Sequence, residues 1–326
     1  MIYLASHTLR TSSWHRPMLR FAALMTAMIV VSAAGLALDD RVLLGDPIWL
    51  KPFKFAISIT LYSVTWAWLY ALLDRGQRLA GRVSTGIVWV LFVEYVIIVT
   101  QVVRGEASHF NVGTPLNATL FSVMGVSIAL LWTGTLILTV LVLRSRIEDA
   151  ANRWAIRLGA LISLAGLALG ALMVGPTDAQ SAAMDAGTFQ GFVGAHSVGV
   201  PDGGPGMPIT GWSTTGGDLR IPHFVGMHAL QIMPLLAIAL TVLARRRPAL
   251  LTEAVRARLV VVAAAGYAGL VALVTWQALR GQSLIHPDAL TMLAFGALVV
   301  GVTIGALYSL RDHATDNDID RKVAKR

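Results

Sequence analysis

The sequence is dominated by long blocks of apolar residues that contain almost no charge. These blocks run for roughly 18 to 26 residues, which at about 1.5 Å of helix rise per residue is enough to cross a hydrocarbon layer about 30 Å thick. Backbone amide groups inside such a layer must find hydrogen-bond partners within the chain, and single blocks of this length do so as helices. The chain, with only 13% charged residues, is therefore predicted to be an all-α, polytopic membrane helical bundle.

Eight transmembrane helices are expected, at residues 21–38, 53–73, 85–103, 118–143, 154–174, 223–244, 259–279 and 289–310. Twenty Lys and Arg residues fall in the two termini and the loops on their side, against six on the other side. Basic residues mark cytoplasmic loops, so both the N- and C-termini are expected in the cytoplasm. A cleaved signal peptide is the alternative for the first block, because Arg10, Arg16 and Arg20 precede it.

The use of Arg over Lys, 22 against four, is typical of a GC-rich bacterial genome. Together with the eight spans it predicts a multi-pass protein of the bacterial inner (plasma) membrane. The net charge of +8 is explained by the cytoplasmic loops, so no nucleic-acid partner is expected.

Two stretches of the chain resemble each other and indicate an internal repeat. Gln101-Val-Val-Arg104-Gly105 and Gln277-Ala-Leu-Arg280-Gly281 end the third and seventh blocks, 176 positions apart. Ala-Gly-Leu-Ala-Leu also occurs at 34–38 and at 165–169. A parallel four-plus-four duplication is therefore predicted. The expected divisions are a cytoplasmic N-terminal segment at 1–20, a first repeat at 21–143, a second repeat at 144–310 with an outer loop at 175–222, and a charged cytoplasmic tail at 311–326.

Glu94 is the most unusual residue, because it is expected near the middle of the bilayer. An ionised carboxylate at that depth costs about 3 kcal/mol on insertion scales, so it must be protonated, paired or in contact with water. Glu94, Gln101 and Arg104 fall on one helix face that is expected to point into the protein. A functional role is predicted for Glu94, and a purely structural hydrogen bond is the alternative.

The remaining polar residues of the spans cluster in their outer half. Lys51 and Lys54 begin the second block on the outer side, against the orientation bias, and snorkelling to headgroups is their alternative explanation. Pro234 is expected to kink the sixth span. The residues predicted to bind a ligand or to couple its movement to protons are Lys51, Lys54, Glu94, Gln101, Arg104, Asp218, Arg220, His228, Gln231, Gln277 and Arg280.

Three outer-side histidines, His109, His223 and His228, could bind haem iron or a divalent metal. His223 and His228 are five residues apart, about 140° around a helix, so they do not form the i, i+4 pair that chelates one ion. The chain has no Cys, which excludes thiolate metal sites. No cofactor is the expectation, with haem or a divalent metal as the alternative.

The outer loop at 175–222 is long and rich in glycine. A short helix is expected at 177–186, capped by Thr177, and the loop is interpreted as a lid over an outward-facing cavity.

Three functions are compatible with these features. The first is a transporter or binding protein for a small anionic solute or lipid, with the lipid bilayer and that ligand as partners. The second is a membrane oxidoreductase or haem- or quinone-binding protein that uses the outer histidines. The third is a structural or assembly subunit. No hydrolase or ATPase motif is present, whether the chain catalyses a reaction stays open, and the sequence predicts no oligomeric state.

Overall fold

The computed structural model describes residues 11–323, with side chains described through residue 311. Residues 1–10 of the predicted N-terminal segment and 324–326 of the predicted tail lie outside this range. The described chain is all-helical apart from two short hairpins, as predicted.

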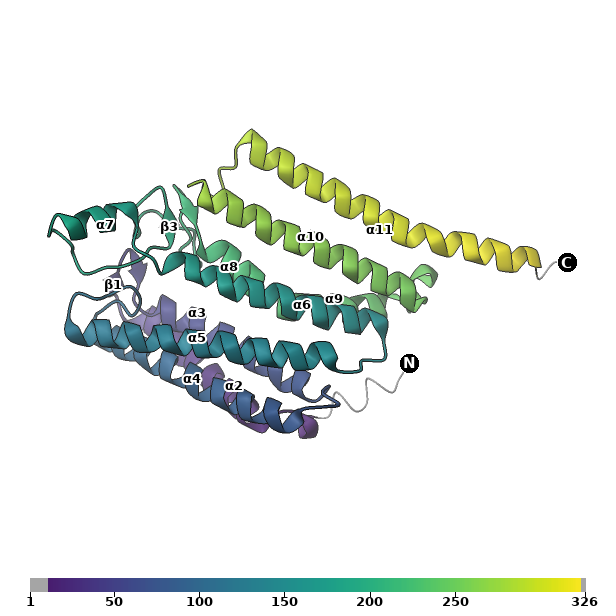
Figure 1. Cartoon of the computed structure of the whole chain (residues 1–326), viewed down its shortest axis with the longest axis horizontal. Helices are drawn as coiled ribbons and strands as arrows, with labels where there is room; N and C mark the ends of the chain where they lie inside the picture. Colours follow the sequence, from purple (N-terminus) through teal and green to yellow (C-terminus); the bar gives the residue numbers. More distant parts are fainter. Residues whose placement is uncertain (1–10, 324–326) are drawn as a thin grey trace.

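A first group of helices comprises α2 (Arg16–Leu38), α3 (Leu50–Tyr70), α4 (Gln77–Arg104) and α5 (Pro115–Arg144), after a short 3-10 helix η1 (Thr11–Ser13). Between α2 and α3, β1 (Val42–Leu43) pairs antiparallel with β2 (Asp46–Pro47). Within this group, α2 packs on α3 and α4 packs on α5 (Figure 1).

The second group repeats this packing with more interruptions. It comprises α6 (Ala150–Leu169) with η2 (Gly170–Met173), α7 (Asp178–Asp185), α8 (Arg220–Met227), α9 (Ala229–Leu243), η3 (Pro248–Leu250), α10 (Glu253–Leu279) and α11 (Ala289–Val323). A second antiparallel hairpin joins β3 (Ser197–Val198) to β4 (Gly217–Asp218). Helix α6 packs on α8 and α9, and α10 packs on α11.

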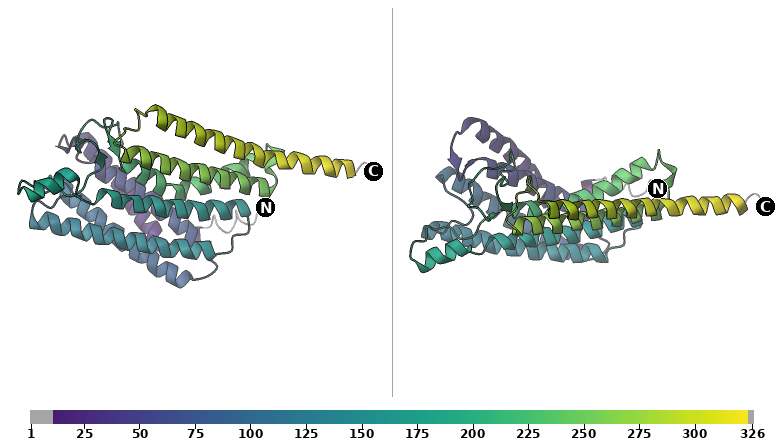
Figure 2. Two further views of the ribbon diagram at one scale, coloured as in Figure 1. Left: turned by 45° about the horizontal axis from the view of Figure 1, so that its top comes forward. Right: turned by 90° about the horizontal axis from the view of Figure 1, so that it is seen from above.

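The long helices run side by side, so the bundle has two distinct ends (Figures 1 and 2). One end carries α7 and both hairpins, and we call it the loop end. The other end carries the first described residues, from Thr11, and the C-terminal part of α11, and we call it the terminus end. Helix α11 lies on the outside against α10 and extends beyond the bundle at the terminus end, so the residues assigned to a separate tail from 311 continue this helix to Val323.

Six helical segments are long and apolar enough to cross a membrane within the described residues, and the bent pair α8 and α9 makes a seventh if it counts as one span. The six are Arg16–Leu38, Gln77–Arg104, Pro115–Arg144, Ala150–Asp185, Glu253–Leu279 and Ala289–Arg311. The predicted count of eight is not confirmed, because α3 does not qualify. Helix α3 carries Lys51, Lys54 and several hydroxyl side chains among its apolar residues.

The predicted kink of the sixth span lies at a different residue. Helices α8 and α9 meet at His228 with a bend of 43°, whereas Pro234 lies within α9. A proline ring collides with the carbonyl four residues before it, here that of Leu230, so the distortion falls on the N-terminal side of the proline. The bend is therefore one to two turns earlier than predicted, next to two histidines.

Glycines set the closest approach between the first two helices of each group. A methyl group added to Gly35 of α2 would overlap the Trp49 ring at the start of α3. A methyl group added to Gly166 of α6 would overlap the backbone of Gly226 and Met227 in α8. Both glycines come from the Ala-Gly-Leu-Ala-Leu sequence that occurs twice, and each lies at a close contact with the next helix, at its start for Gly35 and within it for Gly166.

The Gly166 contact yields a stability test. Gly166→Leu should destabilise the protein by about 1–3 kcal/mol, because backbone cannot move aside as a side chain can. The expected result is a lower unfolding temperature in mild detergent. Gly301→Leu in α11 is the matched control, because a side chain there meets nothing within 4 Å and should leave the unfolding temperature unchanged or higher. Equal unfolding temperatures for the two variants would contradict the packing.

Candidate functional site

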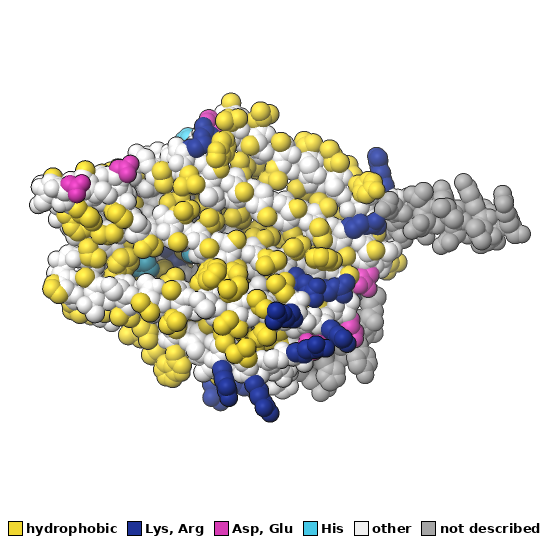
Figure 3. All heavy atoms as spheres, viewed as in Figure 1, with side chains coloured by type: hydrophobic (Ala, Val, Ile, Leu, Met, Phe, Trp, Pro, Cys, Tyr) yellow, Lys and Arg dark blue, Asp and Glu magenta, His cyan; other side chains and the backbone are white. Residues whose placement is uncertain are grey.

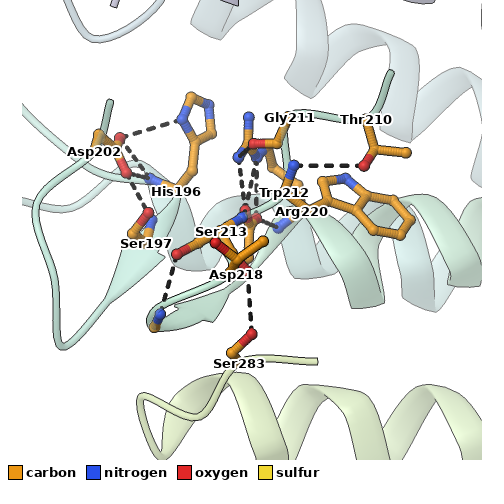
Figure 4. A network of polar contacts seen from close by, with 12 residues as sticks. His196, Ser197, Asp202, Thr210, Gly211, Trp212, Ser213, Asp218, Arg220 and Ser283 are labelled. Carbon is orange, nitrogen blue, oxygen red and sulfur yellow. Dashed lines mark hydrogen bonds and ion pairs between the residues drawn. The ribbon is translucent and has the colours of Figure 1, made fainter. Parts of the chain in front are cut away.

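A buried ion pair organises the loop end of the second group. Strand β4 ends at Asp218, whose side chain is 1% exposed, and α8 begins two residues later at Arg220. The carboxylate accepts hydrogen bonds from the backbone N–H of Ser213 at 2.8 Å and of Arg220 at 3.0 Å, and the Arg220 guanidinium binds both of its oxygens (Figure 4). Ser283 donates to the carbonyl of Ser213 from the far side of this network. Asp218 thereby fixes Arg220 in one orientation.

Two lysines from the start of α3 approach the same region. The Lys54 ammonium donates to the carbonyl of Thr210 at 2.8 Å and ties the first group to the long loop. Lys51 is half-buried and lies within electrostatic range of Lys54, Arg220 and Glu94. In the part of the chain that the structure describes, no hydrogen bond or ion pair joins the Lys51 ammonium to another group. Three cations are thus concentrated at one level of the bundle.

Glu94, on α4, lies within electrostatic range of one of these cations, Lys51. Its side chain is 2% exposed, and neither carboxylate oxygen has a hydrogen-bond partner among the described residues. The neighbouring Tyr95 hydroxyl contacts the carbonyl of Pro52 at 3.4 Å, which holds this part of α4 against the start of α3. Lys51 interacts electrostatically with Glu94 without forming an ion pair. Buried Glu94 and half-buried Lys51 therefore lie near each other without a direct bond between them.

A ring cluster, formed by His109, Phe110 and His196, lies at the loop end near these cations. Asp202 accepts from the backbone N–H of His196 and Ser197 and lies 3.2 Å from Nδ1 of His196 (Figure 4). The His196 and Phe110 rings pack edge to face with their centroids 4.9 Å apart, and Phe110 also packs edge to face with His109. Phe110 has a positive φ of 66°, which is unfavourable for a bulky residue and is held by the surrounding contacts.

Burial keeps both histidines of this cluster uncharged. It lowers the pKa of His109 well below 6.5, and Lys51 and His196 lower it further. Burial likewise lowers the pKa of His196, the hydrogen bond to Asp202 opposes that change, and Arg220 and Lys51 reinforce it. For Asp202, burial acts to raise the pKa, but hydrogen bonds from His196 and Ser197 outweigh it and hold that pKa below its usual range. Both histidines are therefore neutral bases near Lys51, and His196 also lies near Arg220.

Arg104 and Arg280 of the predicted site have another position. Both are exposed and bind the start of the following helix: Arg104 donates to Asn117 at 2.9 Å, and Arg280 pairs with Asp288 and contacts Thr291. Their geometry ties helix ends together, so the structure does not bring them to Lys51.

Gln101 and Gln277 have equivalent buried positions at these two helix ends. Each amide donates to the backbone carbonyl six residues later, at 3.1 Å and 2.8 Å respectively. The following Gly105 and Gly281 have φ values of 73° and 70°, the left-handed conformation that ends a helix. The predicted Gln-x-x-Arg-Gly repeat is thus the same helix-ending device used twice.

The polar residues at the α8–α9 bend form a separate group deeper in the bundle. Gln231 donates to Thr65 of α3 at 3.2 Å and lies 3.3 Å from Nδ1 of His228, so it connects the two helix groups. Nδ1 of His223 lies 2.9 Å from the carbonyl of Gly166. Within the described residues, no three His, Asp or Glu side chains gather in an arrangement suited to one metal ion, so His109, His223 and His228 do not form such a set.

The sequence reasoning missed the partners that hold the ring cluster. Neither Asp202 nor Phe110 is among the residues that the sequence predicts for the site. The available signal was weak: His196 and Asp202 are six residues apart in a loop, and no helical or strand period connects them. The short helix after Thr177 is confirmed as α7, with Thr177 and Gln180 forming a reciprocal capping box.

Comparison of the chain with protein-family models, with curated proteins and with solved structures found no match.

The neutral histidines make the loop end sensitive to acid. Local unfolding of the loop end exposes His109 and His196 to water, and each imidazole then takes up a proton near pH 6.5. In the closed loop end, Lys51 and Arg220 oppose their protonation, and only Asp202 favours it. The free energy of unfolding of the loop end is therefore highest above about pH 6.5, and it decreases as the pH falls toward the lowered pKa values of the two histidines in the folded protein.

Amide hydrogen exchange of residues 175–222, corrected for intrinsic rates, should show protection falling between about pH 7 and pH 5. His196→Gln should flatten this dependence. Protection that stays constant over that range in the unaltered protein would contradict the assignment.

Proposed function

We propose that this chain is a multi-pass bacterial inner-membrane protein whose loop end faces outward and whose termini are cytoplasmic. The support is the charge distribution: Lys and Arg side chains gather at the terminus end, and apolar side chains cover the face between the ends (Figure 3). Basic residues are retained on the cytoplasmic side during insertion. In this arrangement α3 crosses the membrane inside the bundle, where its lysines and hydroxyl groups are shielded from lipid, and the span count is eight.

The two helix groups are the products of a four-plus-four duplication in this proposal. The support is the occurrence of Ala-Gly-Leu-Ala-Leu in the first helix of each group and the equivalent use of Gln101 and Gln277 at the third helix end. The first helix packs on the second, and the third on the fourth, in both groups. The charged cluster lies where the start of α3 from one group meets the long loop of the other.

The function that this geometry supports best is outward-facing binding, and transport, of a small anion or of the anionic end of a lipid. The observation that carries it is the Lys51 ammonium, which is half-buried beside Lys54 and Arg220 and has no bonded counter-charge in the described residues. A half-buried ammonium is only partly solvated, and an anionic ligand would supply the counter-charge that the described residues do not bond to it. The neutral His109 and His196 add hydrogen-bonding groups at the same level without adding charge.

Glu94 is the proton-coupling residue in this proposal. Because it is buried without a hydrogen-bond partner, no local contact depends on its remaining a carboxylate. Glu94 interacts electrostatically with Lys51. A proton on Glu94 therefore strengthens the positive field at the anion site, and loss of that proton weakens the field. Anion binding and proton uptake therefore favour each other.

Lys51→Gln should weaken the binding of inorganic phosphate by about tenfold or more, the value of one charge-assisted hydrogen bond. The measurement is isothermal titration calorimetry on the protein purified in mild detergent. Arg41→Gln is the control, because Arg41 is an exposed basic residue on the same side that pairs with Asp39. Phosphate affinity that is the same in both variants, or undetectable in the unaltered protein, would contradict the proposal.

Glu94→Gln should retain phosphate binding and abolish proton movement that accompanies phosphate uptake. The substitution keeps the side-chain volume and breaks no hydrogen bond, so folding is preserved. Proteoliposomes containing a trapped pH-sensitive dye report the proton flux after phosphate addition. Unchanged flux in Glu94→Gln would exclude Glu94 as the coupling residue.

A further inference from the structure

The bundle has a hollow in its side wall, near the loop end. In the space-filling view it lies between the segments of α5 and α6, with His and Lys or Arg side chains visible at its floor and apolar side chains around it (Figure 3). A polar floor inside an apolar wall differs from the middle of that face, where apolar side chains predominate (Figure 3).

The α5 wall of the hollow follows from helix geometry. The Trp132 indole donates to the carbonyl of Leu164 at 3.2 Å, so this face of α5 points toward α6. Gly125 is seven residues earlier and Phe121 eleven residues earlier, which places both on the same face. Phe121 contacts the Phe110 ring at 5.8 Å, whereas a side chain added at Gly125 would meet nothing within 4 Å. The face is thus closed at both ends and open at Gly125.

The α6 wall shows the matching gap. Ala168 is four residues beyond Leu164 toward the loop end and is exposed, as is Leu172 four residues further. Beyond the gap the chain closes again, because Val193 N–H donates to the Phe110 carbonyl at 2.9 Å and Ala195 N–H to the Met173 carbonyl at 3.1 Å. From Trp132 to Phe121 the opening extends about 16 Å along the helix.

The rim of this opening is lined by exposed apolar side chains. Ile128, seven residues after Phe121 on the same face of α5, is 46% exposed, and Leu161 and Leu172 on the α6 side are 44% and 47% exposed. The opening therefore faces the acyl chains of the bilayer if α5 and α6 cross it. Inside, Phe110 stacks on His196 and His109, and both histidines lie within electrostatic range of Lys51. A molecule that enters here meets apolar walls first and cations second.

We propose that the ligand is an amphiphile with a phosphate headgroup, which enters between α5 and α6 from the outer leaflet and places its phosphate at Lys51, Lys54 and Arg220. This inference rests on the proposed anion site and specifies its ligand. The charge and the wall are complementary to the two parts of one molecule: the three cations take the phosphate, and the passage past Gly125 holds an acyl chain. A free phosphate uses only the first part of the site.

The experiment compares a lipid with its soluble headgroup. Phosphatidylglycerol, phosphatidylcholine and glycerol 1-phosphate are titrated against the protein in mild detergent, with native mass spectrometry for the lipids and calorimetry for glycerol 1-phosphate. Phosphatidylglycerol should bind about tenfold or more tightly than glycerol 1-phosphate, since burial of about two methylene groups already supplies that factor. Phosphatidylcholine should bind about tenfold or more weakly than phosphatidylglycerol, because its headgroup has no net charge.

Two substitutions close the passage from opposite walls. Gly125→Phe and Ala168→Phe should each weaken phosphatidylglycerol binding by about tenfold or more and leave glycerol 1-phosphate binding unchanged. Gly86→Phe in α4 is the matched control, because Gly86 is also a helical glycine at which a side chain meets nothing within 4 Å. It should leave both affinities unchanged.

The outcomes separate the two proposals. If glycerol 1-phosphate binds in a Lys51-dependent manner while phosphatidylglycerol binds no more tightly, or while neither Phe substitution weakens the lipid, the lipid inference is wrong and the anion site stands. Equal binding of phosphatidylglycerol and phosphatidylcholine also overturns the inference. If Lys51→Gln changes neither phosphatidylglycerol nor glycerol 1-phosphate binding, the anion site itself is wrong.

Discussion

The constraint on which this structure depends is that a backbone in hydrocarbon must satisfy its own hydrogen bonds. Long helices do so along their length, and irregular chain is confined to their ends. Both hairpins, α7 and the 186–216 connection therefore lie at one end of the bundle, and the charged cluster of Lys51, Lys54 and Arg220 lies with them. The location of the candidate site is a consequence of this confinement.

The helix ends themselves require polar side chains, and this explains part of the polarity of the sequence. Gln101 and Gln277 are buried because they satisfy carbonyls just beyond the helices that carry them. Arg104 and Arg280 bind the next helix at its first turn. These four residues fulfil a structural need that recurs in both helix groups. Glu94 is different, because its oxygens serve no such need in the described residues.

Period and composition are sufficient to predict the helices, the burial of Glu94 and Gln101 on α4 and the cap at Thr177, but not the exposure of Arg104. They were insufficient wherever two distant segments had to meet. Arg104 and Arg280 looked equivalent to Lys51 and Arg220 as outer cations, and only their partners, Asn117 and Asp288, separate the two sets. The pairing of His196 with Asp202 depends on a loop with no period, so no sequence rule could place it.

The sequence by itself determined the all-helical, membrane-type architecture, because apolar blocks of this length leave the backbone no other way to satisfy its hydrogen bonds. It also determined the two equivalent helix ends, since Gln, Arg and Gly at fixed spacing act within a few residues of one another. Only the tertiary structure decided which polar groups converge and which face the gap between α5 and α6. Those relations join residues on different helices and loops, such as Lys54 with Thr210 and Trp132 with Leu164, and the contacts between helices that set them are made by packing, which local spacing does not encode.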